Sequence, residues 1–176
     1  MTYKTAGVPV VPQVDGIVSR LLPVATTAVA AILSIQPVHI PSYEALAPAF
    51  MLMAVYHWTI YRPDLLPASA VFLIGISHDL LAGGSLGVTT VVLLLGREAV
   101  VRYRRWFPDR GFLFVWGGFA LLTTAAISAL WLLHSLLEAK IVDFRSSIFR
   151  AVLTVSLFPF ASFLLGRTQR ALMGAR

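Results

Sequence analysis

The stretch GISHDLLAGGSLG (residues 75–87) places an ionisable side chain, Asp79, near the end of a long apolar run and then interrupts that run with glycines. A charged side chain at the centre of a bilayer costs about 2.5 to 3.5 kcal/mol on insertion scales. Asp79 therefore needs either a function inside a membrane or a position near the membrane edge. A second apolar run, LGVTTVVLLL (86–95), follows at once. This pattern predicts two antiparallel helices joined by a short glycine-rich turn.

The composition of the whole chain is that of a membrane protein. Of the 176 residues, 58% are hydrophobic and only 12% are charged, and the mean hydropathy is +0.82. Soluble domains carry about 25% charged residues. The chain has no cysteine, which excludes disulfides, thiolate metal sites and a cysteine nucleophile. The net charge of +6 comes mainly from arginines between the apolar segments, which indicates membrane orientation rather than nucleic-acid binding.

Six apolar segments approach the ~20 residues that a membrane-spanning helix needs. Five of them cover approximately residues 17–36, 43–61, 65–83, 111–137 and 147–166, and the fourth in chain order begins near Leu86 with an apolar run that meets Arg97. We therefore expect an all-α polytopic membrane protein, a compact bundle of six transmembrane helices. The transmembrane domain covers residues 17–166, between an N-terminal arm (1–16) and a C-terminal tail (167–176).

The distribution of lysine and arginine predicts the orientation of this bundle. If the N-terminus is cytoplasmic, the inner segments contain eleven of these residues and the outer segments three, namely Lys140, Arg145 and Arg150. Cytoplasmic loops are enriched in lysine and arginine. Both termini are therefore predicted to be cytoplasmic. The aromatic side chains of Tyr56, Trp58 and Tyr61 are expected to anchor the second segment at the level of the lipid head groups.

Two roles for Asp79 follow from its position about one helical turn before Gly83. Its carboxylate can accept hydrogen bonds from backbone N–H groups around residues 85–87, because the start of a helix favours an anion. It would then hold the two helices together as a hairpin. Alternatively, it lines an outward-facing pocket with His78 or Arg150 nearby. The candidate hairpin or pocket residues are His78, Asp79, Gly83, Gly84 and Gly87.

The fourth segment contains a second group of charged residues, Arg97, Glu98 and Arg102. Glu98 and Arg102 are four residues apart and are expected to pair on one helix face. Arg97 can extend its guanidinium toward the inner membrane surface. These three residues are a candidate contact with a partner at that surface.

No pattern in the sequence supports catalysis. The glycines at 83–87 lack the Lys-Ser/Thr of a phosphate-binding loop, and the four histidines show no metal-ligand spacing. We therefore expect neither an enzyme nor a bound cofactor.

Two segments of the chain resemble the MreD family, the rod shape-determining membrane proteins of bacteria. YHWTIYRPDLLP (56–67) is similar to an aromatic segment of the family in which Arg-Pro precedes an acid. GISHDLLAGGSLGVTTVVLLL (75–95) is similar to its Gly-x-x-x-Asp-Leu-Leu segment. The inner-face residues of the first segment are Tyr61, Arg62, Pro63 and Asp64. His78, before the aspartate, and the charged pair Arg97-Glu98 depart from the family pattern.

The resemblance implies a non-enzymatic scaffold of the cell-elongation machinery in the cytoplasmic (inner) membrane. Such a scaffold maintains rod shape and directs lateral peptidoglycan synthesis. Its direct partner would be an MreC-like single-span protein, and its indirect partners MreB, RodA and the transpeptidase of RodA. The family fold is expected to resemble the substrate-binding subunits of energy-coupling-factor transporters. The alternative function is therefore a substrate-binding membrane subunit of a vitamin transporter, which relies on a separate ATPase.

Overall fold

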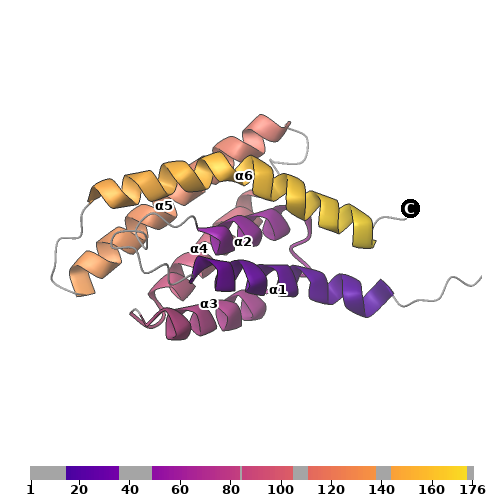
Figure 1. The fold of residues 1–176 in the computed structure, drawn as a ribbon, viewed down its shortest axis with the longest axis horizontal. Helices are drawn as coiled ribbons and strands as arrows, with labels where there is room; N and C mark the ends of the chain where they lie inside the picture. Colours follow the sequence, from indigo (N-terminus) through magenta and orange to yellow (C-terminus); the bar gives the residue numbers. More distant parts are fainter. Residues whose placement is uncertain (1–14, 36–48, 84, 105–110, 138–143, 174–176) are drawn as a thin grey trace, which may run out of the picture.

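The computed structural model describes residues 15–35, 49–83, 85–104, 111–137 and 144–173. Over these residues the chain forms six α-helices and no strand (Figure 1). The helices are α1 (Asp15–Ser34), α2 (Phe50–Tyr61), α3 (Ala68–Ala82), α4 (Val88–Tyr103), α5 (Phe112–Leu137) and α6 (Phe144–Met173). The predicted all-α class is thus confirmed for the described part of the chain.

The helices differ from the predicted spans mainly in length. The structure gives α2, α3 and α4 only 12, 15 and 16 residues, whereas α6 continues past Gly166 to Met173. Residues 43–48 of the expected second segment lie outside the described residues. Two helices, Phe112–Leu136 and Arg145–Thr168, are long and apolar enough to cross a membrane. A bundle of six spans therefore stays a prediction.

Helix α2 lies at the centre of the bundle, packed against α1, α4 and α6 (Figure 1). All ten residues from Met51 to Ile60 are buried. The sequence of α2 is apolar on every side, and a helix of this kind is buried either in a protein core or in lipid. Here the neighbouring helices cover it. Its position makes α2 the element on which the other helices converge.

The aromatic residues of α2 correct one sequence-based expectation. Tyr56 and Trp58 are 1% and 0% exposed, so their side chains face neighbouring helices and cannot anchor in the lipid head groups. The Tyr56 hydroxyl donates to the Val115 carbonyl at 2.8 Å, and Trp58 Nε1 donates to Thr26 Oγ1 at 2.9 Å. Buried tyrosine and tryptophan need such partners. Only Tyr61, 46% exposed, fits the expected position at the edge of the bundle.

A cluster of three rings joins α2 to α5 and α6. Phe119 and Phe158 stack with their centroids 4.0 Å apart, and Tyr56 meets them at 5.1 Å and 5.6 Å. Offset-stacked and edge-on ring pairs contribute about 0.5 to 1.5 kcal/mol beyond the burial of their area. These contacts fix the two long helices against the central one.

Two glycines mark the turn between α3 and α4. Gly83 ends α3 with φ of 66°, and Gly87 precedes α4 with φ of 85°. Both angles lie in the left-handed region, which other residues adopt only at a cost. Gly84 lies outside the described residues. The resulting hairpin packs α3 along α4.

Candidate functional site

Asp79 connects the end of α3 to the beginning of α4. Its Oδ2 atom accepts hydrogen bonds from the backbone N–H of Gly87 at 3.0 Å, the backbone N–H of Thr90 at 3.2 Å and the Thr90 hydroxyl at 2.9 Å. The side chain is 3% exposed. The hydrogen bonds to the start of the next helix that the sequence suggested are therefore present, although Thr90 was not foreseen.

These bonds supply a cap that α4 lacks in its own sequence. The residue before α4 is Gly87, and no side-chain hydrogen bond from this position caps the helix. The first N–H groups of a helix have no partner within the helix, and a carboxylate there is further favoured by the helix dipole. Asp79 satisfies two of these backbone groups from a neighbouring helix. The carboxylate thus has hydrogen-bond partners that offset the cost of its burial.

Gly75 allows the two helices to approach closely enough for these bonds. A Cβ atom at Gly75 would lie 3.0 Å from Thr90 Oγ1 and 3.1 Å from Thr90 Cα. Gly75 precedes Asp79 by four residues, so both lie on the same face of α3. The sequence analysis did not identify Gly75 as a site residue. Its i, i+4 spacing from Asp79 is the signal that would have suggested it.

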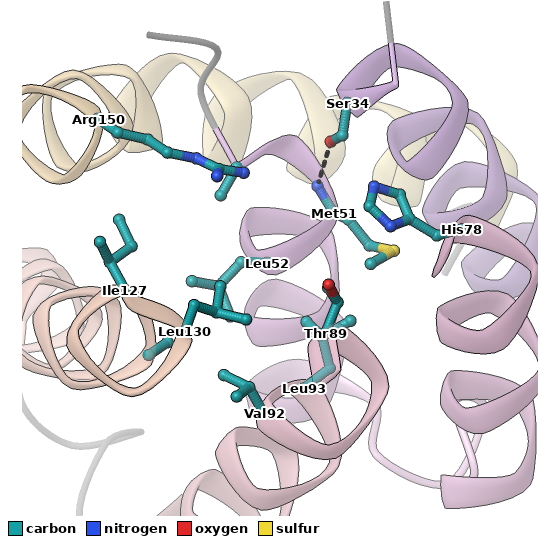
Figure 2. Close-up of a pocket in the computed structure, with 12 residues that line it drawn as sticks. Ser34, Met51, Leu52, His78, Thr89, Val92, Leu93, Ile127, Leu130 and Arg150 are labelled. Atoms are coloured by element: carbon teal, nitrogen blue, oxygen red, sulfur yellow. Dashed lines mark hydrogen bonds between the residues drawn. The ribbon is translucent and has the colours of Figure 1, made fainter. Parts of the chain in front are cut away.

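His78 points to a different environment from that of Asp79. Its Nδ1 lies 3.6 Å from Asp79 Oδ1, and the ring lines a pocket that also contains Ser34, Met51 and Arg150 (Figure 2). Asp79 itself is not among the lining residues. His78 thus lines the pocket, whereas the carboxylate of Asp79, the next residue of α3, is hydrogen-bonded to the start of α4.

The pocket is small and mostly apolar. The space open to the centre of a water molecule is about 40 Å³, enough for a few water molecules. Its remaining walls come from α2, α4 and α5, namely Leu52, Thr89, Val92, Leu93, Ala126, Ile127 and Leu130, with Ala49 before α2. His78 and Arg150 face it from opposite sides (Figure 2). A ligand the size of a vitamin does not fit in this space.

The charged residues of α4 make other contacts than predicted. Arg97 Nε donates to the Leu66 carbonyl at 3.1 Å, and the Arg97 side chain is only 12% exposed. Glu98 lies 3.7 Å from Arg97. The predicted pair between Glu98 and Arg102 is wrong, since no such ion pair forms although both residues are described. Arg97 points into the bundle, where a backbone carbonyl satisfies part of its guanidinium.

The segment Tyr61–Asp64 forms the exposed turn after α2. Arg62 and Asp64 lie 3.7 Å apart, with side chains 44% and 68% exposed, and surface pairs of this kind contribute little stability. The same linker provides the Leu66 carbonyl that holds Arg97. Arg97 is thus hydrogen-bonded to the linker that continues from this turn to α3.

Across the described residues no three histidine, aspartate or glutamate side chains come together as metal ligands. What the structure does place at the α3–α4 hairpin is a helix cap and a small pocket. A family model described as "rod shape-determining protein MreD" matches residues 16–168 of the chain. The chain belongs to the MreD family. No curated protein and no solved structure matches it.

The MreD match begins within α1 and ends within α6, so all six helices belong to the family region. It includes the hairpin with Asp79, the Tyr61–Asp64 turn and Arg97. MreD proteins are rod shape-determining membrane proteins, and the two apolar helices of this chain agree with a place in a membrane.

Proposed function

We propose that this MreD-family protein is a non-enzymatic scaffold in the bacterial cytoplasmic membrane. It binds an MreC-like single-span protein and, through that partner, acts with MreB, RodA and the transpeptidase of RodA in lateral peptidoglycan synthesis. The family match over residues 16–168 carries this proposal. The protein crosses the membrane six times with both termini in the cytoplasm, as its lysine and arginine distribution favours.

The small, mostly apolar pocket favours the scaffold over the transporter alternative. Binding sites for drug-sized ligands are clefts of about 300 to 1,000 Å³ with a few convergent polar groups. The pocket between His78 and Arg150 has about 40 Å³ open to water. A substrate-binding subunit needs a larger polar cavity to recognise a vitamin.

An open apolar groove supports contact with a helix of another protein. The groove lies between α1, α2 and α6. The space in it that is open to the centre of a water molecule is about 310 Å³. Several lining residues are small, namely Ala25, Thr26, Ala30, Ala54 and Ala161. Small side chains let helix backbones approach closely within a membrane. We assign this groove to the membrane-spanning helix of the MreC-like partner.

Affinity purification from membranes in mild detergent, with mass spectrometry of the partners, tests this function. We expect an MreC-like protein in near-stoichiometric amount. Ala30→Leu fills the groove and should reduce this recovery at least tenfold, whereas Ser128→Leu, on an exposed position of α5, should leave it unchanged.

The outcomes separate the function from the docking surface. Loss of the partner with Ser128→Leu but not with Ala30→Leu would move the contact to α5 and keep the scaffold. Recovery of an ATPase and a coupling subunit would contradict the scaffold and indicate a transporter. Unchanged rod shape after deletion of the protein would contradict it as well.

A further inference from the structure

Arg150 is a charged residue on α6 for which the described part of the chain provides no counter-ion. Its side chain is partly buried, and its Nε atom is fully buried without a hydrogen-bond partner. An arginine stays protonated in proteins. A buried charge of this kind is costly unless it is paired.

Arg150 points into the pocket that His78 lines, rather than away from the bundle. The side chain runs from α6 toward the first turn of α2, where Met51 lines the same pocket (Figure 2). Thr154, one turn further along α6, accepts a hydrogen bond from the Ala49 backbone N–H at 3.1 Å. Ser34 accepts one from the Met51 N–H at 3.3 Å. The start of α2 is thus held against α1 and α6 beside the guanidinium.

Both features attract a negative charge. The N-terminus of a helix carries a partial positive charge and binds anions, and a guanidinium binds phosphate oxygens through two parallel hydrogen bonds. Asp79 follows the pocket residue His78 in the sequence, but its carboxylate already accepts three hydrogen bonds at the start of α4. No carboxylate of the described residues forms an ion pair with Arg150.

The position of Arg150 in α6 favours a membrane lipid as the source of the anion. Arg150 lies five residues inside the candidate span Arg145–Thr168, about 7.5 Å along the helix axis from its end, and an arginine side chain can extend from such a position toward the lipid head groups. The space of about 40 Å³ is too small for a whole lipid, so only the head-group phosphate would enter it. We propose that Arg150 and the first turn of α2 bind the phosphate of a membrane lipid head group. This site is independent of the scaffold function.

Thermal unfolding of the purified full chain in neutral detergent tests this site. The probes are phosphatidylglycerol, diacylglycerol with the same acyl chains but no phosphate, and inorganic phosphate. We expect phosphatidylglycerol alone to raise the Tm, by roughly 5 °C at saturation. Arg150→Gln should abolish the rise. Arg167→Gln, on an exposed position of the same helix, should retain it.

Arg150→Lys keeps the charge without the fork geometry and should retain part of the rise, so it replaces the glutamine variant if that variant does not fold. An equal rise in wild type and Arg150→Gln would overturn the proposal, as would an equal rise with diacylglycerol. A rise with inorganic phosphate alone would replace the lipid by a soluble anion. No rise with any probe would also overturn it.

Discussion

At the scale of single residues, Asp79 shows how an acid is tolerated near the end of an apolar helix. One oxygen accepts three hydrogen bonds from the start of α4. Asp79 therefore caps the N-terminus of α4, although it belongs to the preceding helix, α3. This arrangement makes the hairpin depend on a single side chain.

Replacing Asp79 by alanine should destabilise the protein because three donors on α4 lose their acceptor in a buried place. An unsatisfied buried donor costs about 1 to 3 kcal/mol. We expect Asp79→Ala to lower the Tm in detergent by several degrees. Asp79→Asn, which keeps one oxygen acceptor, should have a smaller effect. Ser77→Ala is the control, since the exposed Ser77 hydroxyl donates only to Leu73 of its own helix. Equal Tm values for Asp79→Ala and Ser77→Ala would contradict the capping role.

The prediction for Asp79 succeeded because its partner follows closely in sequence. Gly87 follows Asp79 by eight residues across a glycine-rich turn, so its backbone N–H was within reach of prediction. The contact between Arg97 and the Leu66 carbonyl joins positions 31 residues apart. It depends on how α4 packs against the linker before α3, which the sequence does not specify. Helical spacing alone suggested the wrong partner for Glu98.

At the scale of helices, the α3–α4 contact depends on the missing side chain of Gly75. Alanine there would bring Cβ to 3.0–3.2 Å from Thr90 atoms and push α4 away from Asp79. Overpacking of this kind costs about 1 to 3 kcal/mol. We expect Gly75→Ala to lower the Tm clearly. Gly117→Ala, where nothing lies within 4 Å of the added Cβ, should leave it unchanged or slightly raised, since alanine favours helix. A similar effect of both variants would show that the contact is not close.

The order and number of the described helices could be predicted from apolar runs and turn residues, but the length and burial of α2 could not. An apolar sequence suits contact with lipid and contact with protein equally well. Tyr56 and Trp58 were therefore expected at the head groups, whereas both have partners inside the bundle. Only the packing of α1, α4 and α6 around α2 distinguishes the two environments.

At the scale of the whole molecule, the orientation in the membrane can be tested because the chain has no cysteine. Single cysteines at Asp64 and Ser85 lie on either side of α3. We expect a membrane-impermeant maleimide to label Ser85→Cys in intact cells and Asp64→Cys only after permeabilisation. The reverse pattern would invert the predicted orientation. Labelling of both from one side would mean that α3 does not cross the membrane.

The central place of α2 also has a consequence for biosynthesis. Translation completes α2 before α4 and α6 exist, although both pack against it. At 12 residues, α2 extends about 18 Å, which is less than the ~30 Å hydrocarbon core of a bilayer. In a nascent chain, the faces of α2 that α4 and α6 cover in the complete protein therefore stay exposed until those helices are inserted. Chains arrested before Phe144 should be substrates for membrane quality-control proteases, while full-length chains escape them.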